Sequence, residues 1–219
     1  MHTTDPIITV VMSVFNGSMY LHDTLASILN QEYDNFELIV TNDGSLDNTG
    51  KILDNFAAKD NRVRPIHQQN IGLTESLNRM IRLARGQFIA RMDSDDLSHP
   101  QRLKKQVDFL QKNPRCVAVG TWYRNTFDDH TQDYESCVPS NLSIMRSLLL
   151  EGMNFFAHGS MMIRKSVFSE QNYYYRWRYG QDYDLWLRLI EKYEMGMVEE
   201  ILYERRDHSS SLSKKLIPR

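Results

Sequence analysis

Three carboxylates in four residues could bind a metal: Asp93, Asp95 and Asp96 directly follow the apolar segment 87–91. A carboxylate inside a protein costs several kcal/mol unless a cation or hydrogen bonds offset its charge. Mg²⁺ and Mn²⁺ take oxygen ligands of this kind and usually keep coordination positions open for phosphate. Acidic clusters also occur as solvated loops, but the place of this one behind a strand-like segment favours a metal site.

Strand-like segments recur before the acidic cluster, with amphipathic helical patterns between them. The segments rich in β-branched and apolar residues are 7–14, 36–41, 63–67 and 88–91. Strands that alternate with helices pair in parallel through right-handed crossovers. The polar turns 15–18, 42–45 and 93–96 would then lie at the carboxyl ends of strands, where open α/β sheets bind ligands. The sequence therefore predicts an α/β protein with a mostly parallel sheet and one binding edge.

The second half of the chain is less regular. The expected elements are a helix through Leu103, Val107 and Leu110, a strand near 117–123, a polar turn at 128–138, a helix at 144–150, a strand at 158–163 and a helix at 184–193 capped by Asp182. No repeat, low-complexity tract or linker divides the chain, so residues 1–219 are predicted to form a single domain.

Composition excludes several classes of protein. The chain has 219 residues, a formal net charge of −2 and two cysteines. This charge argues against nucleic acid as a partner, and two cysteines are too few for a disulfide framework. The first residues lack a signal-peptide pattern, and no apolar run approaches the roughly 20 residues of a membrane span. We therefore expect a cytoplasmic protein, with peripheral contact at the inner face of the membrane left open.

Five motifs occur in the order and spacing of a known family. They are Ser13-Val14-Phe15-Asn16, the segment 37–47, Asn70-Ile71-Gly72, the segment 91–96 and the segment 180–186. In these motifs the chain resembles the family 2 glycosyltransferases, which are inverting, nucleotide-sugar-dependent enzymes with the GT-A fold, over residues 7 to about 213. The resemblance implies a Rossmann-like α/β/α sandwich. Its nucleotide-sugar-binding half would be residues 5–97, approximately, and its acceptor-binding half residues 98–213.

The resemblance also implies which residues bind the nucleotide. They are Phe15, Asn16, Asp43, Asn70, Gly72 and Asp93. Asp43 would accept a hydrogen bond from the N–H of uracil, which suits a carboxylate acceptor; the family usually has Asp where Asn42 stands. Because Asp43 lies at a strand end, we expect its substitution to weaken nucleotide binding and to leave folding nearly intact.

For metal and catalysis, the resemblance assigns Asp95 and His208 to Mn²⁺ or Mg²⁺, and Asp182 to the base that takes the acceptor proton. Two alternatives stay open: Asp182 caps the following helix, or Asp184 is the base. Contacts to donor or acceptor are assigned to Asp96, His158, Asp184 and Trp177. Trp177 belongs to the aromatic and cationic segment 173–179, which would stack on sugars, lie at a membrane interface or cover the core.

The predicted function is transfer of a hexosyl or N-acetylhexosaminyl group from a nucleotide sugar, UDP-linked, to a saccharide or lipid-linked saccharide in bacterial surface polysaccharide synthesis. One alternative is a sugar-phosphate nucleotidyltransferase, which needs a Gly-rich cationic loop after the first strand. Residues 15–20 contain one glycine and no cation. A second alternative is a non-catalytic nucleotide- or carbohydrate-binding module. The chain lacks G-x-G-x-x-G after its first strand, which excludes a dinucleotide-binding oxidoreductase.

Overall fold

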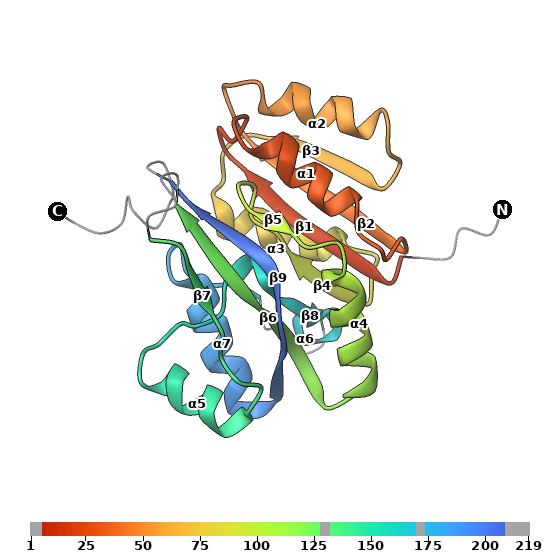
Figure 1. The fold of residues 1–219 in the computed structure, drawn as a ribbon. Helices are drawn as coiled ribbons and strands as arrows, with labels where there is room; N and C mark the ends of the chain where they lie inside the picture. The colour runs from red at the N-terminus through yellow and green to blue at the C-terminus, as the bar shows by residue number, and fades with distance from the viewer. Residues whose placement is uncertain (1–5, 128–131, 170–173, 209–219) are drawn as a thin grey trace.

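The computed structural model describes residues 6–127, 132–169 and 174–208 (Figure 1). Within them, a nine-stranded sheet has the order β3-β2-β1-β4-β8-β6-β9-β5, and β7 pairs with β6 beside this path. The strands are β1 (Ile8–Val14), β2 (Phe36–Asp43), β3 (Val63–Gln68), β4 (Phe88–Arg91), β5 (Leu97–Ser98), β6 (Cys116–Phe127), β7 (Tyr134–Ser136), β8 (Met162–Arg164) and β9 (Glu194–Asp207). The helices are α1 (Leu21–Leu29), α2 (Thr49–Ala57), α3 (Leu73–Leu83), α4 (Arg102–Lys112), α5 (Leu142–Leu150), the 3₁₀ turn η1 (His158–Ser160), α6 (Lys165–Ser169) and α7 (Gln181–Lys192).

The first four strands form the parallel part of the sheet, as predicted. β1 pairs in parallel with β2 and β4, and β2 pairs in parallel with β3. Every residue of β2 and β4 is buried, as expected for strands covered on both faces. The carboxyl ends of β1, β2 and β4 therefore lie along one edge, and the turns that follow them lie together.

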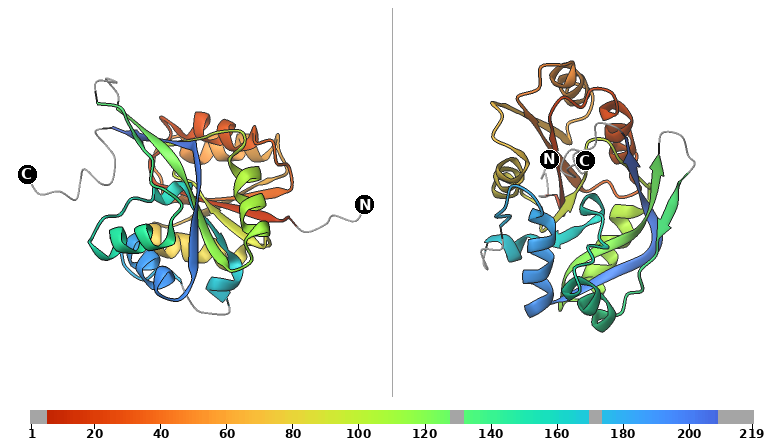
Figure 2. Two further views of the ribbon diagram at one scale, coloured as in Figure 1. Left: turned by 60° about the horizontal axis from the view of Figure 1, so that its bottom comes forward. Right: turned by 90° about the vertical axis from the view of Figure 1, so that its left-hand side faces the viewer.

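Helices cover both faces of the sheet (Figures 1 and 2). On one face, α1, α2 and α4 enclose a core that includes Ile8, Val10 and Met12 of β1. On the other face, α3, α5, α6 and α7 enclose a second core that includes Val11. Alternate side chains of β1 thus enter different cores, because successive residues of a strand point to opposite faces. This arrangement confirms the predicted α/β/α sandwich.

Beyond β4 the strands run in mixed directions. β8 is antiparallel to both β4 and β6, whereas β9 runs parallel to β6 and antiparallel to β5. The pairing of β6 with β9 extends from Cys116 to Phe127, with register shifts near Trp122. In Figure 1 these two strands form a long ribbon across the lower half of the molecule. The sheet therefore continues from the first half of the sequence into the second without a break.

The structure corrects several predicted elements. The strand predicted at 158–163 is the turn η1 followed by the short strand β8, and the turn predicted at 128–138 contains β7. β6 continues four residues past the predicted end at 123, and β9 was not predicted at all. β9 contains Glu199, Glu200, Glu204, Arg205 and Arg206, and these charges conceal its apolar alternation.

One helix start also differs from prediction. α7 begins at Gln181 after Gly180, which is the N-cap with φ 63°. Asp182 therefore lies in the first turn of α7, and the prediction that it caps the helix was wrong. α2 begins at Thr49 with Asn48 at its N-cap, and the Asp47 carboxylate accepts a hydrogen bond from the Thr49 N–H at 3.0 Å.

Some predictions fall outside the described residues: the turn at 128–131, Tyr173 of the aromatic segment and the acceptor half after 208. Among the helices of the described residues, none has the length and apolar character that a membrane crossing requires.

Candidate functional site

The Asp43 carboxylate holds the loop before α3 against the turn after β2. The side chain of Asp43 is 2% exposed. Its Oδ1 accepts hydrogen bonds from the Gln68 amide at 2.8 Å and the Ile71 N–H at 2.9 Å, and its Oδ2 accepts from the Gly72 N–H at 2.9 Å. The structure thus brings Asp43, Asn70 and Gly72 together. Because two backbone N–H groups depend on Asp43, the expectation that its loss would leave folding intact must be revised.

Close packing explains a glycine in the turn after β2. Gly44 has φ 79°, and a Cβ there would lie 2.8 Å from the backbone nitrogen of Asn70. A side chain at this position would push the two loops apart and lengthen the hydrogen bonds of Asp43. Asn70 itself is exposed at the surface of this junction.

The loop after β1 is fastened to the same turn. The Asn16 N–H donates to Ser45 Oγ at 2.9 Å, and the Leu46 N–H donates to Asn16 Oδ1 at 2.8 Å. Asn16 has φ 52°, a left-handed conformation that asparagine tolerates better than most residues. Phe15 is 55% exposed, so its ring remains available to a flat ligand. The predicted nucleotide residues Phe15, Asn16 and Asp43 therefore lie on adjoining loops.

At Asn42, where the family usually has Asp, both the oxygen and the nitrogen of the side-chain amide have a hydrogen-bond partner. Its Oδ1 accepts from the Ser45 N–H at 3.0 Å, and its Nδ2 lies 3.2 Å from His67 Nδ1. His67 Nε2 lies 2.9 Å from Asp54 Oδ1. An aspartate at position 42 would keep the bond to Ser45 but could donate nothing to His67. The amide therefore suits its local partners.

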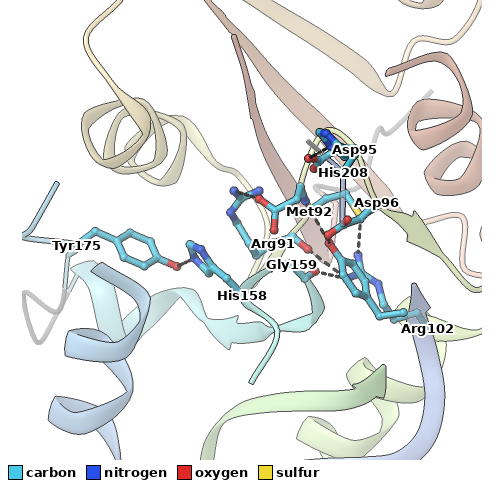
Figure 3. Close-up of polar contacts among 11 residues, drawn as sticks. Arg91, Met92, Asp95, Asp96, Arg102, His158, Gly159, Tyr175 and His208 are labelled. Atoms are coloured by element: carbon cyan, nitrogen blue, oxygen red, sulfur yellow. Dashed lines mark hydrogen bonds and ion pairs between the residues drawn. The ribbon is translucent and has the colours of Figure 1, made fainter. Parts of the chain in front are cut away.

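The acidic turn after β4 has a different arrangement (Figure 3). The Arg91 guanidinium donates to Asp93 Oδ1 at 2.5 Å, and Asp95 Oδ2 lies 3.0 Å from His208 Nε2. Asp96 is 3% exposed and accepts from the Tyr203 hydroxyl at 2.5 Å and the Arg206 N–H at 2.8 Å. Asp96 therefore orients β9, whereas Asp93 and Asp95 remain partly exposed.

Two of the three carboxyl groups in this turn have raised pKa values. Burial raises the pKa of Asp95, and the charge of Asp93 raises it further. Burial and the charges of Asp93 and Asp95 place the pKa of Asp96 well above its usual range. At Asp93, burial acts to raise the pKa, but the electrostatic effects of Arg91, His158 and Arg205 and the hydrogen bond from Arg91 together outweigh it, and the pKa is lowered. A cation bound at this turn would relieve the repulsion.

Two buried arginines lie beneath the acidic turn, and sequence reasoning assigned a role to neither. Arg91 is 2% exposed, and its Nε and Nη1 have no hydrogen-bond partner within the described residues. Arg102 is fully buried and donates to the carbonyl oxygens of Arg91 at 3.1 Å and Gly159 at 2.6 Å. Burial lowers the pKa of Arg102 to about 10. A charged residue inside an apolar strand, as at Arg91, was the available signal.

Tyr203 and Gly159 complete the floor of the turn. A Cβ on Gly159 would lie 1.7 Å from the Tyr203 hydroxyl and 2.8 Å from Asp93 Oδ2. Position 159 therefore has no room for a side chain while Tyr203 binds Asp96. No sequence pattern indicated this contact, because Tyr203 lies in the strand that was not predicted.

His208 follows β9 directly and is 6% exposed. Its ring packs on Tyr20 of the loop before α1, with centroids 4.6 Å apart. The predicted metal residues Asp95 and His208 are thus brought together. Within residues 6–127, 132–169 and 174–208, no group of three or more His, Cys, Asp or Glu side chains converges as a metal centre.

The first turn of α7 presents two carboxylates with different partners. Asp182 Oδ2 accepts from the Asn154 amide at 2.9 Å. Asp184 Oδ2 accepts from Arg188 Nε and Nη2 at 2.9 and 2.6 Å, one helical turn along. Asp184 is therefore engaged within its own helix, and this ion pair weighs against it as the base. Sequence reasoning did not single out Asn154.

His158 lies between the acidic turn and α7. Its Nε2 is 2.9 Å from the Tyr175 hydroxyl. Burial, followed by the positive charge of Arg91, lowers the pKa of His158 to about 4. The imidazole is therefore neutral at neutral pH. Trp177 is 60% exposed, and its backbone oxygen accepts from the Thr74 hydroxyl at 2.5 Å.

Comparisons with known proteins agree on one family. The family model described as "Glycosyl transferase family 2" matches residues 9–171. The chain is 34% identical over 216 residues to the O-antigen biosynthesis glycosyltransferase WbnJ of Escherichia coli, a match that covers 96% of this chain and 84% of WbnJ.

Two solved structures show the same fold. S. aureus TarS 1-349 in complex with UDP-GlcNAc has a TM-score of 0.75 at 16% identity, covering 93% of this chain and 59% of that one. The mannosyltransferase PcManGT from Pyrobaculum calidifontis, in complex with GDP-Man and Mn²⁺, has a TM-score of 0.67 at 19% identity, covering 93% and 57%. The chain thus spans less than two thirds of either structure.

Proposed function

Because the chain belongs to glycosyl transferase family 2, we propose that it is an inverting glycosyltransferase that moves a hexosyl or N-acetylhexosaminyl group from a UDP-sugar to a saccharide or lipid-linked saccharide. The observation that carries this proposal is the cluster of Asp93, Asp95 and Asp96, in which the pKa values of Asp95 and Asp96 are raised, beside the edge where the loops after β1, β2 and β3 meet. The relation to WbnJ supports a role in bacterial surface polysaccharide synthesis.

The donor nucleotide would lie along the carboxyl ends of β1, β2 and β4, in the half formed by residues 5–97, approximately. Phe15 supplies an exposed ring, and the Asp43 carboxylate, which has about four acceptor positions, keeps one beyond the three hydrogen bonds it accepts. Asn16, Asn70 and Gly72 would provide the neighbouring walls, and Asp93 would contact the ribose. TarS with UDP-GlcNAc and PcManGT with GDP-Man support a nucleotide sugar as the ligand.

The residues of the acidic turn fit a divalent cation. Asp95 and His208 offer an oxygen and a nitrogen 3.0 Å apart, and burial and the charge of Asp93 raise the pKa of Asp95. Mg²⁺ and Mn²⁺ are commonly held by one or two carboxylates together with substrate phosphates, so two protein ligands suffice. When bound, Mn²⁺ or Mg²⁺ supplies positive charge that offsets the diphosphate leaving group. Mn²⁺ in the PcManGT complex supports this assignment.

Asp182 would act as the base from the acceptor-binding half, residues 98–213. As the acceptor oxygen bonds to the anomeric carbon, its proton passes to the Asp182 carboxylate. The bond between that carbon and the diphosphate oxygen breaks, and its electron pair leaves with UDP from the opposite face. Because the acceptor oxygen attacks the face opposite the diphosphate, the configuration at the anomeric carbon is inverted. His158, neutral and bonded to Tyr175, would contact donor or acceptor as a hydrogen-bonding group without charge.

The test combines binding with turnover. Thermal unfolding with UDP-, GDP- and TDP-sugars, each with and without Mn²⁺, should show stabilisation by one nucleotide class. Release of that nucleotide with saccharide acceptors should then fall at least about 100-fold in Asp182→Asn, which keeps the size of the side chain, while donor binding persists. No stabilisation by any nucleotide sugar would refute the proposal. Binding without transfer to any acceptor would indicate a binding module instead.

A further inference from the structure

The chain reverses direction after α5 in a way that aims one side chain at α7. The Met153 N–H donates to the Leu148 carbonyl at 3.0 Å, and the Gly152 N–H donates to the Leu149 carbonyl at 3.1 Å. Gly152 has φ 91°. These two bonds around a left-handed glycine form a Schellman motif, which fixes the exit of the chain from a helix. Asn154 is therefore placed by a defined backbone turn.

The end of α5 is also fastened to the first turn of α7. The Tyr183 hydroxyl donates to the Leu149 carbonyl, the same residue that the Schellman motif uses. Met145 and Leu149 of α5 are fully buried in the core that contains Leu185 and Trp186 of α7. The distance from the turn at Gly152 to Asp182 is consequently set by packing between two helices.

Across this junction the Asn154 amide donates to Asp182 Oδ2 at 2.9 Å. Asn154 is the one hydrogen-bond partner that the described part of the chain gives to the Asp182 carboxylate. An unrestrained carboxylate rotates about its terminal bond, which has a broad torsional preference. A donor on Oδ2 fixes the carboxylate plane and leaves Oδ1 to take a proton.

We propose that Asn154 is a positioning residue for the catalytic base: it holds the Asp182 carboxylate in the orientation in which Oδ1 meets the acceptor hydroxyl. This inference rests on the proposed role of Asp182. Both side chains are accessible from solvent, as a base that meets a second substrate must be. Asn154 acts only through Asp182, so its contribution belongs to the chemical step and not to donor binding.

The chain offers a matched control at the other end of the same helix. Asn141 is the N-cap of α5, and its Oδ1 accepts from the Ile144 N–H at 3.0 Å. It is an exposed asparagine with one hydrogen bond of similar length, but it stabilises backbone and does not contact Asp182. Asn141→Ala should therefore lower the unfolding temperature of the protein and leave turnover unchanged.

The experiment measures kcat, acceptor KM and donor affinity in Asn154→Ala, Asn141→Ala, Asp182→Asn and the double variant Asn154→Ala/Asp182→Asn. The donor is the nucleotide sugar that stabilises the wild-type protein. We expect Asn154→Ala to lower kcat about tenfold or more with donor affinity unchanged, as for loss of one hydrogen bond to a charged group. In the double variant, removal of Asn154 should cause little further loss, because the group that it positions is absent.

The outcomes separate this inference from the proposed function. Wild-type kcat in Asn154→Ala, with Asp182→Asn inactive, would overturn the positioning role and leave the base assignment standing. Multiplicative losses in the double variant would also overturn it, because the two residues would then act independently. Full activity in Asp182→Asn would remove the base, and the positioning role with it.

Discussion

The turns after β2 and β4 both carry buried carboxylates, but they differ in what satisfies them. Asp43 accepts three hydrogen bonds from uncharged groups of its own chain, and its carboxylate joins two loops. Asp93, Asp95 and Asp96 repel one another, and the pKa values of Asp95 and Asp96 are raised. A carboxylate such as Asp43, whose hydrogen bonds come from the chain itself, holds the loops of a site in place. Carboxylates that repel one another, such as those of the acidic turn, favour the binding of a cation. The same contrast separates Asp184, paired with Arg188, from Asp182.

The largest expected effect is at Asp95, in the acidic turn after β4. Asp95→Ala should abolish the dependence of UDP stabilisation on Mn²⁺ or Mg²⁺, because it removes a carboxylate that would bind the cation. Thermal unfolding with UDP, in the presence of each metal and of EDTA, measures this effect. Asp34→Ala, at a highly exposed carboxylate, is the control and should retain full metal dependence. Equal UDP binding with metal and with EDTA in the wild type would show that the carboxylates of the acidic turn do not bind a cation on which UDP binding depends.

The second largest effect is expected at Asp43, in the turn after β2. Asp43→Ala should lower the free energy of unfolding by about 2–4 kcal/mol, because the N–H groups of Ile71 and Gly72 lose their acceptor. Chemical denaturation measures the change. Asp54→Ala, whose exposed carboxylate contacts His67, should change stability by roughly 0.5 kcal/mol or less. If Asp43→Ala is as stable as the wild type, Asp43 does not stabilise the turn after β2, and the contrast with the acidic turn is wrong.

A third prediction concerns His158, which shares the charge of Arg91 with Asp93. Its pKa in the folded protein is about 4, below the ordinary 6.5. As pH falls below 6.5 the unfolded chain takes up a proton that the folded protein does not, so stability is lost until pH approaches 4. Between pH 7 and 4.5 the wild type should lose about 2–3 kcal/mol more than His158→Gln.

Denaturant titrations at the two pH values measure this difference. His22→Gln, at an exposed histidine, should retain the wild-type loss. If His158→Gln and the wild type lose the same stability, the imidazole is not held neutral by burial and Arg91.

The smallest effect should follow loss of the ion pair in α7. Asp184→Asn removes the charge that binds Arg188 but keeps the shape of the side chain. An ion pair of this spacing contributes at most about 1 kcal/mol, so stability should fall slightly and transfer should stay within about threefold of the wild type. Rates of nucleotide release and the denaturation midpoint test this. Abolished transfer would identify Asp184 as the base in place of Asp182.

Local sequence predicted the parallel half of the fold because each strand there is a short apolar run with a helix of clear periodicity behind it. The same regularity placed Asp43 and Asp93 to Asp96 at one edge of the sheet. It could not reveal β9, whose exposed charges mask the alternation of its buried residues. Nor could it assign Asp182 to the first turn of α7, since the left-handed Gly180 supplies the cap position.

Contacts between distant residues escaped prediction for a different reason. Tyr203 reaches Asp96 across 107 residues, and Arg102 reaches Gly159 across 57. Neither pair has a fixed spacing or a local pattern, because the sheet order decides which side chains meet. The order of β8, β6 and β9 cannot be read from residue types alone, and it determines what lies beneath the acidic turn.

The pairing of Asp95 with His208 has a consequence for how the protein is made. The two residues are 113 positions apart, and within the described residues β5 pairs with β9 alone. On a ribosome, the acidic turn emerges long before the strand that shapes it. The nascent chain therefore carries crowded carboxylates without Tyr203, Arg206 and His208 to orient them. The contacts that β9 supplies to the site cannot form before β9 has been translated, so a chain truncated before β9 would have the motif without these contacts.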